Sequence, residues 1–250
     1  MLKIIYYMKL LLTSSSFKGG GIASYAVELI NSYAEHFEMS VLIGDDSLYP
    51  LDKYGVRVYH YDMADTSEKN AREVLTLVNN VIKPDVVINS CYRLMALLTP
   101  FLNNEIKVIN VSHSLRYDEA DYAGFNSEYA DKVVALSGYN KEYLERTFDC
   151  RGKVEVVYNF VRELPNQHQL LQNKLKAKTP VIVFTGGGTA AKSPEIIFGI
   201  VSKLLKTELN FKFYWMGTTT PPFKKIQPFK DIRDILPNDS RLIITGRIPR

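Results

Sequence analysis

The chain has 250 residues, of which 46% are apolar and 23% charged, as in an ordinary globular protein with one large or two small domains. This composition excludes a disordered tail, a collagen-like fibre and a disulfide-stapled miniprotein. The net charge of +4 is spread along the chain without a run of five basic residues, so we expect no nucleic-acid partner.

The start of the chain, MLKIIYYMKLLLTSSS, is similar to a short signal peptide, but Lys9 interrupts its apolar run and no small-residue cleavage site follows. No stretch approaches the ~18 uninterrupted apolar residues of a membrane helix. We therefore expect residues 9–13 to form the first buried strand of a cytoplasmic protein. Cys91 and Cys150 suit a reducing compartment, and we expect both to be small buried residues.

The next segments alternate between helices and strands. Apolar residues recur every three to four positions over residues 22–37, which predicts a helix after the first strand. Strands are expected at 39–44 and 55–61, and a second helix at 67–83 is stopped by Pro84.

Three later runs, DVVINS, KVINVS and KVVALS, are apolar without alternation, which is typical of strands buried on both faces of a parallel sheet. Ser137 is a plausible N-cap for a helix over residues 138–148, and KVEVVYN predicts one more strand. The order of these elements predicts a doubly wound, Rossmann-like α/β domain over residues 1–161.

The composition changes after this domain. Residues 162–179 are expected to be a linker with one short helix, and residues 180–250 a partial second α/β domain. In the second domain, PVIVFT, FKFYWMG and RLIITG predict strands, Ser193 and Pro194 predict a helix start, and 222–236 is helical or irregular. So small a sheet leaves an edge to be covered, which indicates an architecture that is cut short.

A glycine-rich loop, Gly19, Gly20 and Gly21, joins the first strand to the first helix. Glycines allow a ligand to approach the backbone closely, and a helix N-terminus attracts anions. The expected ligand is therefore a phosphate or a sugar hydroxyl. A flexible connection and a dinucleotide fingerprint are the alternatives. Against the fingerprint, Ser24 replaces its third glycine and Ser14 to Lys18 separate the strand from the glycines.

His113 follows the strand KVINVS. At a strand tip it could donate to an oxygen or act as an acid or base, or be satisfied by the local backbone. The following Asp118, Glu119 and Asp121 are expected to form a solvated acidic loop rather than a pair of catalytic carboxylates. No histidines or cysteines have metal-ligand spacing, so no metal is expected.

A second glycine loop, GGGTAAKS, follows the strand PVIVFT. It nearly matches a P-loop, but Ala191 stands where the second glycine should be, and Pro194 places Lys192 before the helix. The loop is therefore interpreted as a diphosphate-binding loop, and the alternative is that its lysine is simply solvated. Its residues are Gly186, Gly187, Gly188 and Lys192.

These motifs, taken in order, resemble the family four glycosyltransferases of the GT-B fold over residues 8–250. The segments that carry the resemblance are GGGIASYAVEL, VINVSHSL, YADKVVALSGYNKEYL, KVEVVYN, FTGGGTAAKS and ITGRIPR. The resemblance implies two facing Rossmann-like domains that transfer a sugar from a nucleotide-diphosphate donor to a saccharide or lipid-linked acceptor, with retention of configuration, in cell-surface glycan synthesis. The nucleotide sugar is a substrate, and no cofactor is implied.

The resemblance also implies roles for single residues. Gly20 and Gly21 match the loop near the donor phosphates and the acceptor, and His113 matches a histidine that contacts the transferred sugar. Lys192 matches a lysine that neutralises the leaving diphosphate, and Asn159 matches a hinge position without a catalytic role. No Asp-x-Asp motif, which metal-dependent transferases use, is present.

Two departures from the family pattern leave alternatives open. Gly187 stands where the family carries an arginine, so Lys18 or Arg247 would have to substitute for it. The family's Glu-x7-Glu segment should lie beyond ITGRIPR, so we expect about 100 residues of a typical member to be missing. An inactive fragment, or a nucleotide- or dinucleotide-binding module without transferase activity, is therefore an alternative. Another is peripheral contact with the inner face of the membrane, through Lys18, Arg93, Arg116, Tyr117 and Tyr122.

Overall fold

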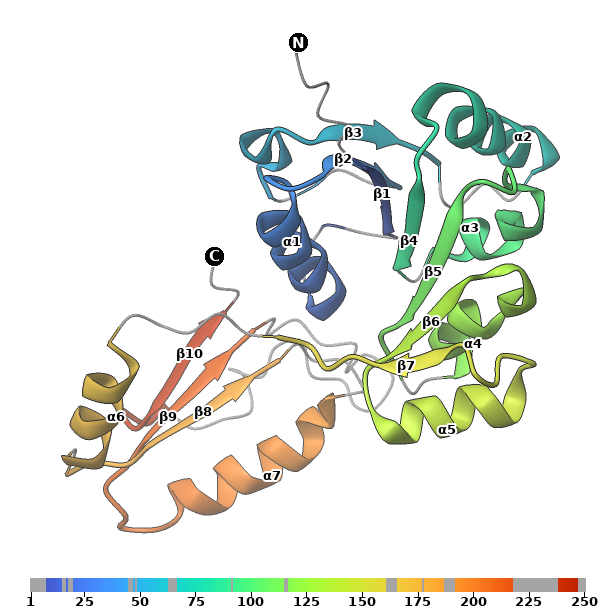
Figure 1. The fold of residues 1–250 in the computed structure, drawn as a ribbon. Coiled ribbons are helices and arrows are strands. Elements are labelled where there is room, and N and C mark those ends of the chain that lie inside the picture. Colours follow the sequence, from blue (N-terminus) through green and yellow to red (C-terminus); the bar gives the residue numbers. More distant parts are fainter. Residues whose placement is uncertain are drawn as a thin grey trace. The chain divides into compact units, whose positions relative to one another are not determined.

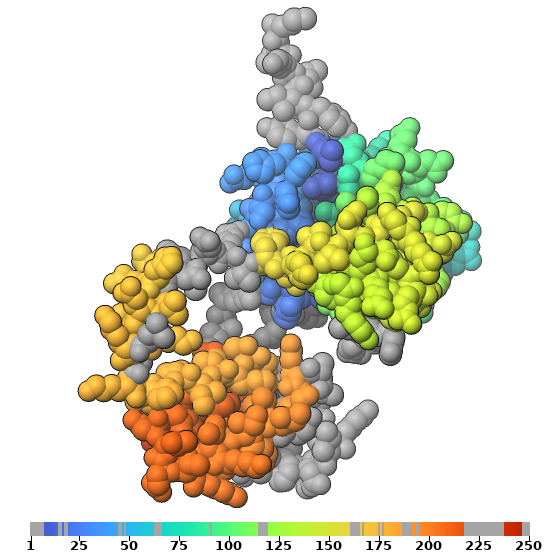
Figure 2. All heavy atoms as spheres, turned by 60° about the horizontal axis from the view of Figure 1, so that its bottom comes forward, coloured from blue at the N-terminus to red at the C-terminus, as the bar shows by residue number. Residues whose placement is uncertain are grey.

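The computed structural model describes residues 8–14, 17, 20–44, 47, 49–62, 67–90, 92–114, 117–160, 166–176, 178–186, 192–217 and 238–246. The chain divides into two compact units, which we call unit 1 (Met1–Val161) and unit 2 (Arg162–Arg250) and describe separately. Figure 1 shows the elements of both units, and Figure 2 shows their heavy atoms.

Unit 1 contains a seven-stranded sheet in the order β3-β2-β1-β4-β5-β6-β7, in which every pairing is parallel. The long apolar runs form its central strands because both faces of these strands are covered. Each strand predicted for this unit is confirmed to within two or three residues at its ends. The strands are β1 (Lys9–Ser14), β2 (Glu38–Ile43), β3 (Arg57–His60), β4 (Val86–Ser90), β5 (Lys107–Ser112), β6 (Lys132–Ala135) and β7 (Val154–Val156).

Helices cover both faces of this sheet, with α1 on one side and α2 to α5 on the other (Figure 1). The segment from α4 to β7 forms one continuous green-to-yellow surface of unit 1 in Figure 2. The α-helices in the described residues of unit 1 are α1 (Gly21–Tyr33), α2 (Glu68–Thr76), α3 (Arg93–Leu98), α4 (Tyr117–Gly124) and α5 (Gly138–Thr147). Short turns lie at Leu51–Tyr54, Thr99–Phe101 and Ser127–Tyr129.

Two predicted helices differ from the expectation at their ends. The first stops at Tyr33 rather than at residue 37, because Glu38 already donates its N–H to the carbonyl of Met8 and starts β2. The second begins behind Ser67, whose side chain accepts from the N–H of Asn70, and continues after α2 as a π-helical turn, Leu77–Ile82. The helices α3 and α4, both of which are short, are not expected from the sequence.

Unit 2 contains a three-stranded parallel sheet in the order β10-β9-β8, with α7 on one face. Its core holds Val201 of α7 and Phe213 and Trp215 of β9, all 3% exposed or less. The three predicted strands and the predicted linker helix are confirmed, and the segment 222–236 lies outside the described residues. The elements are α6 (Gln167–Lys176), β8 (Val181–Thr185), α7 (Pro194–Leu205), β9 (Lys212–Met216) and β10 (Leu242–Gly246).

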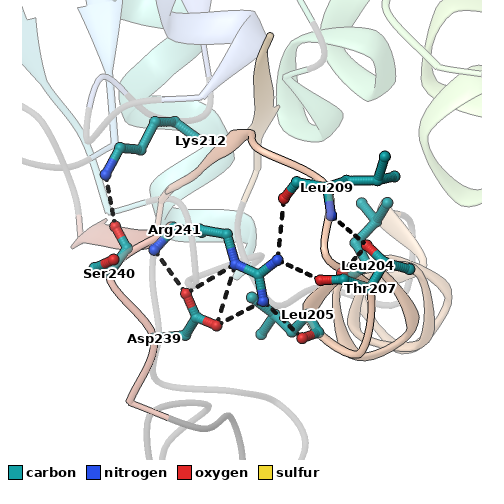
Figure 3. Close-up of polar contacts among 8 residues, drawn as sticks. All are labelled: Leu204, Leu205, Thr207, Leu209, Lys212, Asp239, Ser240 and Arg241. Carbon is teal, nitrogen blue, oxygen red and sulfur yellow. Dashed lines mark hydrogen bonds and ion pairs between the residues drawn. The ribbon is translucent and has the colours of Figure 1, made fainter. Parts of the chain in front are cut away.

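Arg241, just before β10, joins that strand to the end of α7 (Figure 3). Its guanidinium donates to the carbonyls of Leu205, Thr207 and Leu209 at 2.6 to 3.1 Å. It also pairs with Asp239 at 2.8 Å, which lowers the pKa of that carboxyl to about 2. Because the last carbonyls of a helix lack partners within the helix, a cation at this end stabilises it.

Candidate functional site

The strand order of unit 1 reverses between β1 and β4. The connections that leave these two strands run to opposite faces of the sheet, through α1 and α3 respectively (Figure 1). In open parallel sheets such a switch point opens a crevice beyond the carboxyl ends of the strands, where ligands bind. Ser14 and Ser90 end β1 and β4, lie opposite each other in register and are fully buried. The candidate site of unit 1 is therefore expected at these two strand ends.

Helix α1 begins beside this switch point with two glycines. Gly20 has a φ of 98°, which side-chain-bearing residues rarely adopt, and no side chain caps the helix. A Cβ atom on Gly20 or Gly21 would meet no atom within 4 Å. Neither the backbone conformation at position 21 nor packing against the described residues therefore requires a glycine there. The first N–H groups of α1 lack partners within the helix, so they are available to an anion or a hydroxyl at this open end.

His113 follows β5 and is held by side chains from two other elements. Its Nε2 lies 2.7 Å from the Oγ of Ser90, and the edge of one ring meets the face of the other at Tyr25 of α1, with centroids 4.6 Å apart. Burial lowers the pKa of His113 to about 4, so the ring is neutral near pH 7. A neutral imidazole offers one donor and one acceptor, and a pKa this low makes it a weak general base.

The loop behind His113 is anchored to the start of α5. The carbonyl of Ser114 accepts hydrogen bonds at 3.4 Å from the Nδ2 of Asn140, which is 2% exposed, and from the Oγ of Ser112. Ser137 accepts from the N–H of Asn140 at 3.1 Å, which confirms the predicted N-cap. These contacts fix the strand end that carries His113 against the neighbouring helix.

A second polar row crosses the same strand ends on the face that packs against α3. Asn89 accepts hydrogen bonds from Thr13 Oγ1 at 3.0 Å and from the N–H of Tyr92 at 3.1 Å, and donates to Asn110 Oδ1 at 3.1 Å. Thr13, Asn89 and Asn110 are at most 1% exposed and occupy one register row of β1, β4 and β5. The row ties together the three strands that border the switch point.

In unit 2, the structure brings Gly186 and Lys192 together at the carboxyl end of β8. A Cβ atom on Gly186 would lie 3.0 Å from Cζ of Phe184 and 3.4 Å from Cγ of Lys192, so glycine allows the lysine stem to pass close to the strand end. Lys192 is exposed and stands just before α7. Gly19, Gly187 and Gly188, which the sequence analysis also assigns to the two loops, lie outside the described residues.

The start of α7 differs in one respect from the prediction. Ser193 occupies the N-cap position, but it has a φ of 44° and its side chain makes no capping hydrogen bond. Pro194 occupies the first turn as predicted. The N-terminal N–H groups of this helix are therefore not occupied by the expected serine hydroxyl.

A further expectation for unit 1 concerns its acidic residues after His113. The expected acidic loop is wrong: Asp118, Glu119 and Asp121 lie in α4, because Ala120 and Ala123 on the same segment are buried in unit 1. The carboxylate of Asp121 accepts a hydrogen bond from the hydroxyl of Tyr143 at 2.7 Å.

Cys150 is fully buried, as predicted, and burial raises its pKa. Cys91 lies outside the described residues. Among the side chains that the structure describes, no group of three or more His, Cys, Asp or Glu could hold a metal ion.

The sequence matches the family model described as Glycosyltransferase Family 4 over residues 19–163. The chain belongs to Glycosyltransferase Family 4. The matched residues contain the start of α1, Ser90 and His113, so the family pattern covers most of the candidate site of unit 1, while Ser14 of β1 precedes the match. No curated protein matches the chain.

Solved structures share the fold of this family 4 glycosyltransferase. Anabaena HepE in complex with UDP-glucose matches with a TM-score of 0.71 at 13% identity, covering 97% of this chain and 70% of HepE. A glycosyltransferase from Rickettsia africae matches with a TM-score of 0.69 at 16% identity, covering 97% and 69% of the two chains. Sucrose-phosphate synthase from Thermosynechococcus elongatus matches with a TM-score of 0.65 at 13% identity, covering 96% and 71%. These matches confirm the predicted GT-B class, an α/β fold with two Rossmann-like domains.

In this family 4 chain, the two partners of His113, Ser90 and Tyr25, were not predicted from the sequence to be site residues. A signal for Ser90 exists, because the runs DVVINS and KVINVS each end in the serine that ends their strand. No comparable signal marks Tyr25, which lies in the apolar stripe of α1. Among the helices in the described part of the chain, none is long and apolar enough to cross a membrane.

Proposed function

We propose that this family 4 chain transfers a sugar from a nucleoside-diphosphate sugar to a saccharide or lipid-linked acceptor, with retention of configuration and without a metal ion. One observation carries the proposal: in each unit a parallel strand leads through glycine to a helix whose first N–H groups are not capped by the side chain at its N-cap position. The start of α1 adds the neutral ring of His113, and the start of α7 adds the cation of Lys192. The UDP-glucose complex of HepE supports a nucleoside-diphosphate sugar as donor.

Unit 2 would hold the diphosphate. Negative charge accumulates on the leaving diphosphate as the glycosidic bond breaks, and prearranged donors that meet this charge are usually the largest catalytic contribution. Lys192, with its stem against Gly186, and the first N–H groups of α7 are such donors. Hydrogen bonds to charged groups contribute roughly 1.5–3 kcal/mol each, so this set can stabilise the leaving group without a metal.

Unit 1 would hold the sugar and the acceptor. The open space at Gly21 lets an oxygen of the ligand approach the N–H groups of α1 directly. His113 is neutral near pH 7, so it suits a hydrogen bond to a sugar hydroxyl better than it suits proton transfer. A role in cell-surface glycan synthesis, a cytoplasmic location and contact with the inner face of the membrane stay predictions from the sequence resemblance.

Calorimetric titration with UDP-glucose, UDP and NAD tests the donor. Binding of UDP-glucose and UDP supports the proposal, binding of NAD alone indicates a dinucleotide-binding module, and binding of none of the three indicates an inactive fragment. Where sugar transfer is measurable, Lys192→Ala should lower its rate by ~10²-fold, the scale for losing one prearranged donor. Lys203→Ala is the matched control, since Lys203 is an exposed lysine in the last turn of the same helix. Equal rates for the two variants would remove Lys192 from the site.

A further inference from the structure

The contact between His113 and Ser90 constrains where the proton of the histidine ring lies. A serine hydroxyl can donate and accept, so the 2.7 Å distance from Oγ to Nε2 alone allows two arrangements. In one, Ser90 donates its proton to Nε2. In the other, Nε2–H donates to Ser90, and the serine proton needs a different acceptor.

The surroundings of Ser90 favour the first arrangement. Ser90 is fully buried, and within the described residues the ring of His113 is the one hydrogen-bond partner of its hydroxyl. Ser14 lies opposite Ser90 in register, but its buried Oγ makes no hydrogen bond to any described residue and so does not accept the proton of Ser90. A serine proton not given to Nε2 would thus be a buried donor without an acceptor among the described residues, which is costly.

We propose that Ser90 is a positioning residue: it donates to Nε2 of His113 and thereby keeps the ring proton on Nδ1, as a fixed donor to an oxygen of the bound sugar. This inference rests on the proposed function for its ligand. No hydrogen bond from Nδ1 to a described residue is present. The edge-to-face contact with Tyr25 limits rotation of the ring, so the direction of the Nδ1–H bond is held as well.

This assignment gives the two serine hydroxyls at neighbouring strand ends different tasks. Ser90, at the end of β4, acts on the protonation of the histidine ring. Ser112, at the end of β5, is equally buried, but its hydroxyl donates to the carbonyl of Ser114 at 3.4 Å rather than to the ring. Ser112→Ala is therefore a matched control for Ser90→Ala, with the same substitution at the same depth.

Nitrogen NMR of the full chain labelled with ¹⁵N-histidine tests the assignment without any substrate. The spectrum distinguishes a protonated from an unprotonated ring nitrogen, and His113→Gln identifies the signals of His113 among the four histidines. We expect Nδ1 protonated and Nε2 unprotonated at pH 7 in the unsubstituted protein, in Ser112→Ala and in Ser90→Thr, which keeps the hydroxyl. In Ser90→Ala the proton should redistribute toward Nε2.

A proton on Nε2 in the unsubstituted protein would overturn the proposal, and so would an unchanged Nδ1–H form in Ser90→Ala. The first of these decides the matter even where Ser90→Ala does not fold. In transfer assays, Ser90→Ala should raise the KM for the donor about tenfold, the effect of one lost hydrogen bond, and Ser90→Thr should restore it. Failure of the proposed function has a different signature, which is no binding of UDP-glucose by a protein whose NMR spectrum shows the expected tautomer.

Discussion

Replacing Asn89 by alanine should be among the most damaging single changes in unit 1, although its side-chain hydrogen bonds go to Thr13, Tyr92 and Asn110 and not to His113. The side chain joins β1, β4 and β5 through hydrogen bonds with Thr13 and Asn110, and it also accepts from the N–H of Tyr92. Alanine removes all three bonds at once in a region that is at most 1% exposed.

The size of the effect follows from what is left behind. The hydroxyl of Thr13 and the N–H of Tyr92 become buried donors without acceptors, and each such group costs about 1–3 kcal/mol. We therefore expect Asn89→Ala to lower the free energy of unfolding by about 3–5 kcal/mol, a large share of the ~5–15 kcal/mol that stabilises a typical protein. Thr13→Val removes one hydroxyl and leaves Asn89 with two partners, so it should cost only about 1 kcal/mol.

Urea unfolding measured by far-UV circular dichroism gives these differences. Trp215, the only tryptophan of the chain, lies in the core of unit 2, so its fluorescence follows that unit separately. The dichroism transition of Asn89→Ala should move to lower urea, while the tryptophan transition stays where it is in the unsubstituted protein. Equal costs for Asn89→Ala and Thr13→Val would refute the argument that unpartnered donors dominate.

Three further predictions follow from the two units. Gly21→Ala should raise the free energy of unfolding by about 0.5–1 kcal/mol, because Gly21 has a helical backbone and open space where a Cβ would lie. The same substitution should slow sugar transfer, because the added methyl group blocks the ligand. A variant that is more stable and fully active would show that no ligand binds at Gly21. His113 has a pKa of about 4 in the folded chain against 6.5 in the unfolded one, so the unfolded state takes up the proton first. Stability should be complete above pH 6.5 and fall by up to about 3 kcal/mol as the pH drops to 4 and below, a dependence that urea unfolding should no longer find in His113→Gln. Arg241→Ala should lower the thermal midpoint of unit 2, followed by Trp215 fluorescence, because three carbonyls at and just beyond the end of α7 lose their charged donor. Lys212→Ala, which removes a single bond to the Ser240 carbonyl, should lower the midpoint less, and the reverse order would contradict the role of Arg241.

Local patterns in the sequence were sufficient for the strands and for most helices. Runs such as KVINVS are apolar on both faces, and a short run of that kind satisfies its backbone only inside a covered parallel sheet. The glycine loops were visible for the same local reason, since a run of glycines between a strand and a helix marks a backbone that a ligand can approach closely. Helices α3 and α4 escaped this reasoning because α3 is buried nearly all round and α4 places its few small apolar residues among charges.

The sequence by itself thus determined the strands and most helices in their chain order, the two glycine-rich loops and the family. The tertiary structure decided which side chains meet: Ser90 and His113 are 23 residues apart, and Arg241 reaches the carbonyl of Leu205, 36 residues away. Such pairs depend on strand register and on the faces that helices cover, and no local pattern encodes either. For the same reason the low pKa of His113, which burial between β4 and α1 causes, could be found only in the folded chain.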